Sequence, residues 1–189
     1  MILKYQTHYL IKIKILIPVY NDWESLVRLL DEINMTIQDI NNFEFNCVVV
    51  NDSSTIPQPK IQKLSNINSI NIINMKENRG HARCNAFGIR YIFKNKEFDN
   101  LILMDGDGED RPVEIKSLVN EVLKNPNISV VARRIKRSEG TFFQLLYQIH
   151  KIITYIFTGK KVNFGNYSCL TKQDVETLYS KASLWSSYS

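Results

Sequence analysis

Short apolar runs alternate along this chain with longer stretches in which apolar residues recur at helical spacing, and this alternation constrains the fold more than any other feature. Runs typical of β-strands that alternate with helices indicate a mostly parallel sheet covered by helices on both faces. We therefore predict an α/β fold. The predicted strands, with the turns that follow them, lie at residues 11–19, 45–54, 69–75, 100–104 and 128–132, and the predicted helices at 23–33, 79–93 and 112–124.

The size and charge of the chain narrow its class and its partners. Its 189 residues, of which 44% are hydrophobic and 23% charged, fit a single globular domain. A formal net charge of +5 favours anionic partners such as phosphates, nucleic acid or acidic lipid headgroups. The basic residues gather around carboxylates and form no stripe with interleaved aromatic residues, so we predict no nucleic-acid partner.

The cysteines and the N-terminus indicate the compartment. Cys47, Cys84 and Cys169 are far apart and form no CxxC pair, which supports neither a zinc site nor a disulfide framework. We therefore expect a reducing, cytoplasmic setting. The apolar N-terminal stretch is interrupted by lysines, so it predicts neither a signal-peptide core nor a membrane-spanning segment.

Polar and aromatic residues follow the predicted strands at their carboxyl ends, which is where open α/β sheets bind ligands. The first strand leads into Tyr20, followed by Asn21 and Asp22, which can cap the next helix. The second strand ends at "NDSS", the fourth at "DGDGED" and the fifth at "ARRIKR". We expect these ends to form one rim that carries an aromatic residue, several carboxylates and an arginine cluster.

The segment "LILMDGDGEDRP" places several carboxylates directly after one buried strand. Asp105 and Asp107 are separated by a single glycine, so both side chains can reach one cation, and their oxygen atoms suit Mg²⁺ or Mn²⁺. The competing interpretation is a simple turn, because Asp and Gly are turn formers. An EF-hand calcium loop is disfavoured, since Lys116 stands where its twelfth residue would be glutamate.

Five motifs follow one another along the chain, and a family resemblance that they carry extends over nearly all of it. They are "ILIPVYND", "VVVNDSS", "NRGHARCNAFGIRY", "LILMDGDGEDRP" and "VVARRIKR". In these motifs the sequence resembles family-2 glycosyltransferases of GT-A fold, and within them the branch of dolichol-phosphate mannosyltransferases and bacterial polyprenyl-phosphate sugar transferases. The resemblance implies a mostly parallel, Rossmann-like sheet in one catalytic domain over residues 1–189. Relatives usually continue past the position of Ser189, often into membrane-spanning helices, so we expect a domain truncated at its C-terminus.

The resemblance implies a nucleotide-sugar site at the ends of the first two strands. Pro18, Val19 and Tyr20 would line the pocket for the nucleotide base, and Asp52 would accept a hydrogen bond from that base. Asp22 stands where the family usually has glutamate. It keeps a carboxylate within reach of the nucleotide sugar but leaves the identity of the base open.

The resemblance also assigns Asp105 and Asp107 to the DXD motif of the family. Asp105 would lie near the ribose and the metal, and Asp107 would bind the metal itself, with Mn²⁺ or Mg²⁺ as the implied cofactor. His81 lies in the first turn of a predicted helix, and we interpret it as a surface or capping residue.

Further residues are assigned by the same resemblance to phosphate binding and proton transfer. Arg83 would approach the nucleotide, and Arg134 and Arg137 would hold phosphates of the donor or of a lipid acceptor. Glu109 and Asp110 match positions near the acceptor side and are candidate catalytic bases. Both are also typical of solvated turns.

The segment 141–157, "TFFQLLYQIHKIITYIF", is apolar around most of a helix and follows a basic cluster. It favours either a peripheral contact with an anionic membrane surface or a helix packed on the core or on a second copy of the chain. The predicted location is therefore the cytoplasm, at the inner face of the membrane if the first alternative holds.

Together these features predict a metal-dependent, inverting glycosyltransferase that moves a sugar from a UDP- or GDP-sugar to a polyprenyl phosphate or a cell-surface glycan precursor. Inversion is implied by the resemblance alone. One alternative is a non-catalytic module that binds nucleotide sugars. Another is a sugar-nucleotide nucleotidyltransferase, which is disfavoured because "PVYNDWESL" lacks a glycine-rich loop bearing Lys or Arg.

Overall fold

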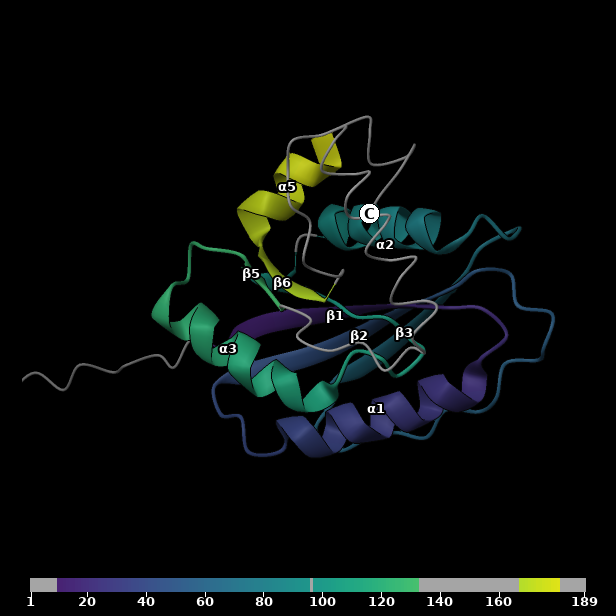
Figure 1. Cartoon of the computed structure of the whole chain (residues 1–189), viewed down its shortest axis with the longest axis horizontal. Coiled ribbons are helices and arrows are strands. Elements are labelled where there is room, and N and C mark those ends of the chain that lie inside the picture. The colour runs from purple at the N-terminus through teal and green to yellow at the C-terminus, as the bar shows by residue number, and fades with distance from the viewer. Residues whose placement is uncertain (1–9, 96, 133–166, 181–189) are drawn as a thin grey trace, which may run out of the picture.

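A computed structural model of the protein describes residues 10–95, 97–132 and 167–180 (Figure 1). These residues form a six-stranded sheet with the order β3-β2-β1-β4-β6-β5. The strands are β1 (Ile11–Val19), β2 (Phe43–Asn51), β3 (Ser69–Asn74), β4 (Asn100–Leu103), β5 (Val130–Val131) and β6 (Ser168–Thr171).

The helices cover both faces of this sheet, as the alternation in the sequence predicts (Figure 1). One face packs against α1 (Trp23–Ile37) and α3 (Ile115–Lys124), which follows a short 3-10 helix, η1 (Pro112–Glu114). The other face packs against α2 (His81–Asn95) and α5 (Lys172–Ser180). The predicted α/β fold with a mostly parallel sheet is confirmed.

The central strand β1 explains why its sequence is nearly continuously apolar. Ile13, Ile15 and Ile17 point into the core shared with α1 and α3, whereas Leu16 packs into the core shared with α2. All four are fully buried. A strand that is covered on both faces has no solvated side on which polar residues would alternate.

Parallel pairing brings the ends of three strands to the same edge of the sheet. Val19 of β1 pairs with Asn51 of β2, and Leu16 of β1 pairs with Leu103 of β4. The segments that follow β1, β2 and β4 therefore leave the sheet side by side. These segments are Tyr20–Asp22, residues 52–54 and residues 105–111, which form the DXD loop.

The strand β6 is the part of the sheet that the sequence did not predict. It lies between β4 and β5 and runs antiparallel to both, so β5 is parallel to β4. The helix α5 that follows was also not predicted. Among the described helices, none is long and apolar enough to span a bilayer. The segment 141–157 lies outside the described residues.

Candidate functional site

The end of β1 forms one wall of the rim. Pro18 and Val19 are buried in the sheet, and Tyr20 is exposed. Asp22 is the N-cap of α1, where its Oδ1 accepts a 3.2 Å hydrogen bond from the Ser25 N–H. The helix cap that the sequence predicts at Asn21 or Asp22 is therefore made by Asp22. The predicted contacts of these residues with a nucleotide stay predictions.

Asn21 does not cap the helix but binds the loop that follows β2. It adopts a left-handed backbone conformation with φ 57°, which asparagine tolerates better than most residues. Its Oδ1 accepts hydrogen bonds from the N–H groups of Thr55 and Ile56, at 2.7 and 3.1 Å. Asn21 thus ties the end of β1 to the loop that follows β2.

Asp52, directly after β2, joins that strand to the start of α2. It is only 3% exposed, and its Oδ1 and Oδ2 accept 2.8 Å hydrogen bonds from the N–H groups of Arg79 and Gly80, respectively. Gly80 has φ +82°, a conformation that side chains other than glycine rarely adopt. Each oxygen of Asp52 thus already binds the chain, and its predicted contact with a nucleotide base stays a prediction.

The DXD loop is held against the sheet by three features. The Asp105 N–H donates a 2.9 Å hydrogen bond to Oδ2 of Asp110, a residue that is 3% exposed. A Cβ atom on Gly106 would lie 2.6 Å from the Pro18 carbonyl oxygen, so only glycine fits where the loop passes β1. The Tyr167 hydroxyl donates a 3.1 Å hydrogen bond to the Arg111 carbonyl, which fastens the end of the loop just before β6.

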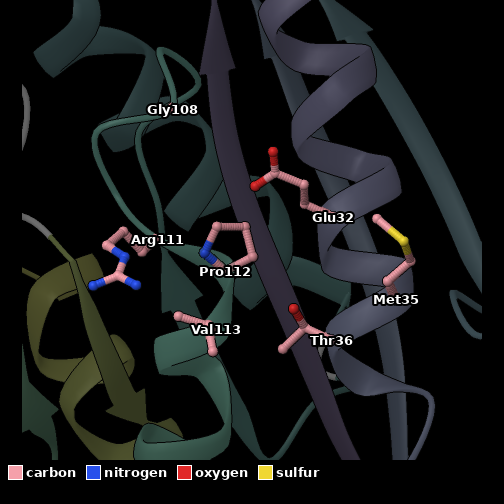
Figure 2. A pocket seen from close by; sticks show the side chains of 7 residues that line it. All are labelled: Glu32, Met35, Thr36, Gly108, Arg111, Pro112 and Val113. Atoms are coloured by element: carbon pink, nitrogen blue, oxygen red, sulfur yellow. The ribbon is translucent and has the colours of Figure 1, made fainter.

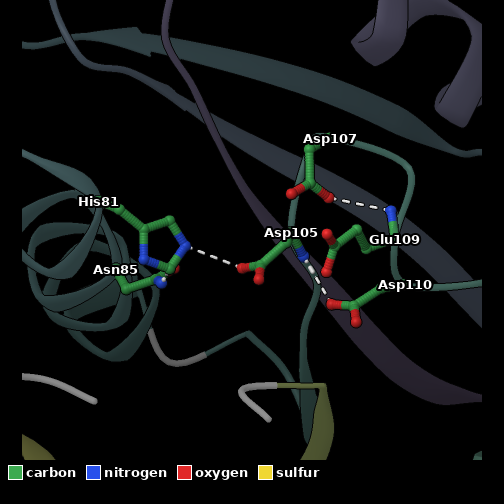
Figure 3. Close-up of polar contacts among 6 residues, drawn as sticks. All are labelled: His81, Asn85, Asp105, Asp107, Glu109 and Asp110. Carbon is green, nitrogen blue, oxygen red and sulfur yellow. Dashed lines mark hydrogen bonds and ion pairs between the residues drawn. The ribbon is translucent and has the colours of Figure 1, made fainter. Parts of the chain in front are cut away.

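The two carboxylates of the DXD motif are oriented differently (Figure 3). Asp105 turns toward α2, where its Oδ1 lies 2.8 Å from Nε2 of His81. Asp107 is exposed, and its Oδ1 accepts a 2.9 Å hydrogen bond from the Glu109 N–H. Among the described residues, Oδ2 of neither aspartate takes part in a hydrogen bond.

The hydrogen bond to Asp105 raises the pKa of His81, an effect that partial burial of the ring opposes. The negative charges of Asp105, Asp107 and Asp110 raise that pKa further. The surrounding carboxylates therefore favour the protonated form of the His81 ring. Its ring nitrogen also lies 3.2 Å from Nδ2 of Asn85, one helical turn further along α2.

The oxygen donors of the DXD loop fit a hard divalent cation that shares its coordination with a ligand. Asp105 and Asp107 each keep one carboxylate oxygen without a partner in the described structure, and Mg²⁺ and Mn²⁺ prefer such oxygens. No cluster of three or more His, Cys, Asp or Glu side chains within the described residues is arranged to hold a metal alone. A cation at this loop would therefore complete its coordination with water or phosphate oxygens.

Of the three arginines predicted to bind phosphates, the structure describes only Arg83. Arg83 lies in the first turn of α2 and is partly exposed, two residues from His81. Arg134 and Arg137 lie outside the described residues, so their predicted contacts with phosphates stay predictions. Arg79 precedes α2 and forms an ion pair with Glu77, in place of the helical position that the sequence predicted.

A pocket of about 400 Å³ opens behind the DXD loop, between the loop and α1 (Figure 2). Neither Asp105 nor Asp107 lines it, so it is separate from the two carboxylates of the DXD motif. The residues that line it are Glu32, Met35, Thr36, Gly108, Arg111, Pro112 and Val113.

Sequence reasoning missed the contact of His81 with Asp105 and that of Asn85 with His81. His81 and Asn85 are four residues apart, so the sequence places them on one face of the predicted helix 79–93. That helix follows the predicted strand 69–75, whose end was expected at the same rim as the carboxylates. The sequence did not reveal which strand end this face would meet.

Residues 14–187 match the family model described as glycosyl transferase family 2. The chain belongs to this family. The predicted family is thus confirmed, and the DXD loop belongs to a glycosyl transferase family 2 domain.

The curated relatives of this family-2 domain fall in the predicted branch. An undecaprenyl-phosphate 4-deoxy-4-formamido-L-arabinose transferase of Proteus mirabilis is 26% identical over 162 residues, which are 85% of this chain and 48% of the relative. A dolichol-phosphate mannosyltransferase of Pyrococcus furiosus is 28% identical over 126 residues, or 66% of this chain and 34% of the relative. The chain thus spans half or less of the length of these relatives.

Solved structures share the fold of this family-2 domain at low sequence identity. A mannosyltransferase from Pyrobaculum calidifontis in complex with GDP-Man and Mn²⁺ aligns with a TM-score of 0.55 at 16% identity, over 88% of this chain and 46% of the other. A glucosyl-3-phosphoglycerate synthase from Mycobacterium tuberculosis in complex with UDP aligns with a TM-score of 0.57 at 13% identity, over 86% and 57%. The predicted GT-A fold is confirmed.

Proposed function

We propose that this domain catalyses the metal-dependent transfer of a sugar, with inversion, from a UDP- or GDP-sugar to a polyprenyl phosphate or a cell-surface glycan precursor. One observation carries the proposal. The carboxylates Asp105 and Asp107 follow β4 at the edge of the sheet where β1 and β2 also end, in a domain of glycosyl transferase family 2. Ligands of open α/β sheets bind at this edge.

The polyprenyl-phosphate acceptor is favoured by the relatives, whose names include undecaprenyl phosphate and dolichol phosphate. A phosphate acceptor carries its nucleophilic oxygen as an anion at neutral pH, so it needs less help from a strong base than a sugar hydroxyl does. We place this reaction at the cytoplasmic face of a membrane, where such lipids expose their headgroups. Contact of residues 141–157 with that membrane, and self-association of the chain, belong to the same proposal.

The donor would lie across the ends of β1, β2 and β4. Tyr20 is the exposed aromatic residue of this rim and is suited to cover the nucleotide base, while Arg83 offers a positive charge at the start of α2. The free oxygens of Asp105 and Asp107 would hold Mn²⁺ or Mg²⁺ together with the diphosphate. When bound, the cation offsets the negative charge that develops on the departing nucleoside diphosphate.

Two carboxylates remain candidate bases for an acceptor that must lose a proton. Glu109 is exposed at the surface of the DXD loop, where an acceptor can approach. Asp110 is buried and accepts the Asp105 N–H, which makes it a support of the loop whatever else it does. Glu109 is therefore the base that we favour for hydroxyl acceptors.

The first test is calorimetric binding of UDP and of GDP, each with and without Mn²⁺. We expect one nucleotide to bind only with the metal, and we expect Asp107→Ala to abolish that binding. The matched control is Asp31→Ala, which removes an exposed carboxylate from α1 and should bind like the wild type. If neither nucleotide binds the wild type in the presence of Mn²⁺, the proposed donor site is wrong.

A second test separates an enzyme from a module that only binds nucleotide sugars. This alternative is kept because the chain spans half or less of the length of its curated relatives. The wild type would be incubated with the nucleotide sugar selected by calorimetry and with undecaprenyl phosphate in detergent. Formation of the glycosylated lipid supports the transferase, whereas tight metal-dependent binding without product supports the module.

A further inference from the structure

The contact between His81 and Asp105 joins two elements that are far apart in the sequence. His81 is the first residue of α2, and Asp105 is the first residue of the DXD loop after β4. Nε2 of His81 lies 2.8 Å from Oδ1 of Asp105 (Figure 3). This pair is the only ion pair between α2 and the DXD loop within the described residues.

This hydrogen bond determines which carboxylate oxygen of Asp105 remains available to a ligand. An ionised carboxylate can only accept hydrogen bonds, so the proton of this bond belongs to Nε2 of His81. The bond commits Oδ1 of Asp105 to α2 and leaves Oδ2 as the oxygen that can face a ligand at the rim. The side chain of Asp105 is only partly exposed, which limits the other orientations that water could stabilise.

Asn85 supports the imidazole ring from inside the protein. It is 1% exposed, and its Nδ2 lies 3.2 Å from Nε2 of His81, while its Oδ1 has no partner among the described residues. A protonated Nε2 has no lone pair that could accept a hydrogen bond from Nδ2, so Oδ1 is the better neighbour of the ring. A half-turn of the amide exchanges the two atoms, and in either orientation one of them has no partner among the described residues. A buried amide with an unsatisfied atom is costly to keep, which points to a functional reason for it.

We propose that His81, supported by Asn85, is a positioning residue that orients Asp105 so that Oδ2 is presented to the metal and the nucleotide. The inference rests on the proposed function, because Asp105 needs a fixed orientation only if it binds a ligand. Groups that hold a metal ligand by hydrogen bonds keep it pre-organised, and their loss typically weakens metal binding about 10- to 100-fold. In this proposal His81 acts through Asp105 and is not itself a ligand of the metal or the nucleotide.

Two other roles for His81 predict different effects of its removal on metal-dependent binding. If the ion pair held Asp105 away from the cation, removal of the imidazole would free the carboxylate and tighten metal-dependent binding. If the pair only fastened α2 to the loop, its removal would lower stability without a specific effect on binding that depends on the metal. A comparison of binding with and without metal therefore separates the three roles.

The experiment measures the affinity of the nucleotide selected above, with and without Mn²⁺, for the wild type, His81→Ala, His81→Gln and Lys94→Ala. Glutamine is chosen because its amide can donate a hydrogen bond to Asp105, as the imidazole does. Lys94 is exposed near the other end of α2, remote in sequence from the loop contact, and serves as the matched control. Urea unfolding of each variant accompanies the binding measurements.

We expect His81→Ala to weaken Mn²⁺-dependent nucleotide binding about tenfold, in the range typical of such supporting groups. Any weak binding without metal should change less, because only a direct contact of Asp105 with the nucleotide is then at stake. His81→Gln should recover much of the lost affinity, and Lys94→Ala should bind like the wild type.

Three outcomes would overturn the inference. Tighter Mn²⁺-dependent binding by His81→Ala would identify the pair as a competitor of the metal. Equal binding by His81→Ala and the wild type would reduce the pair to a structural contact. Absence of Mn²⁺-dependent binding in the wild type would overturn the proposed function and this inference with it, and is distinguished from the other two by the wild type alone.

Discussion

The backbone N–H of Asp105 donates a 2.9 Å hydrogen bond to Oδ2 of Asp110. This bond joins the first and sixth residues of the segment "DGDGED" and gives the loop a buried anchor, because Asp110 is 3% exposed. The four carboxylates of this segment therefore differ in their surroundings. Asp110 holds the loop from within, whereas Asp107 and Glu109 are presented at its surface.

Replacement of Asp110 tests this division. Asp110→Ala leaves the Asp105 N–H without its acceptor and should lower the free energy of unfolding by about 1–3 kcal/mol, measured by urea denaturation. Asp107→Ala, an exposed carboxylate of the same loop, should leave that free energy nearly unchanged while it abolishes metal-dependent nucleotide binding. Equal stability of Asp110→Ala and the wild type would show that the loop does not depend on its buried anchor.

Asp52 provides a second prediction, because it connects β2 to the start of α2. Asp52→Ala removes the acceptor of two backbone N–H groups, those of Arg79 and Gly80, and should cost about 2–4 kcal/mol of unfolding free energy. Asp22→Ala, which removes only one exposed cap contact, should cost about 1 kcal/mol. Urea denaturation of both variants gives the comparison, and a larger loss for Asp22→Ala would contradict it.

Much of the fold could be predicted because its strands and helices have strong local patterns. The apolar run of β1 and the spacing of Trp23, Leu26, Leu30 and Ile33 in α1 identify their elements without knowledge of the rest of the chain. β6 could not be predicted in this way. Its four residues acquire their place in the sheet from pairing with β4, more than 60 residues earlier, and no local pattern encodes that partner.

The position of the site at one edge of the sheet could be predicted, but the contacts between its side chains could not. Parallel strands place the carboxyl ends of β1, β2 and β4 at one edge, so the carboxylates were expected there. The sequence could not distinguish Asp110 as the loop anchor from Asp107 as the exposed acid, because burial depends on how the loop folds back. It also could not place His81 against Asp105, because that contact depends on the packing of α2 on the sheet.

The two glycines of the DXD loop should respond differently to alanine. A Cβ on Gly106 would lie 2.6 Å from the backbone oxygen of Pro18, which cannot move without β1, so Gly106→Ala should cost about 1–3 kcal/mol and weaken metal-dependent binding. A Cβ on Gly108 has nothing within 4 Å, but its φ of +82° is strained for alanine, so Gly108→Ala should cost only about 1 kcal/mol. Thermal and urea unfolding, with calorimetry, check both; the reverse order would refute the close approach to β1.

The three buried cysteines predict a loss of stability at alkaline pH. Burial raises the pKa of Cys47, Cys84 and Cys169 from 9.0 to about 12, so above pH 9 the unfolded chain releases these protons and the folded chain retains them. The unfolded state then binds fewer protons, and stability falls as pH rises from about 9 toward 12.

Replacement of one cysteine isolates this effect from the titration of lysines and tyrosines, which is common to all variants. Between pH 8 and 10, Cys169→Ala should lose about 1 kcal/mol less unfolding free energy than the wild type, although its stability at pH 8 is lower because of the cavity. Urea denaturation at the two pH values measures the difference. Parallel losses in both proteins would contradict the protonated state of Cys169 in the fold.

Asn85 gives a prediction in which stability and binding change in opposite directions. Its side chain is 1% exposed, and one atom of its amide has no partner within the described residues in either orientation of the amide, so Asn85→Leu replaces an incompletely paired amide by an apolar group of similar size. Such replacements are neutral or stabilising, and we expect a gain of about 0–2 kcal/mol in urea denaturation. The same variant removes the support of His81, so Mn²⁺-dependent nucleotide binding should weaken several-fold. A large loss of stability would show that the amide is fully paired in solution, and unchanged binding would show that the imidazole does not need it.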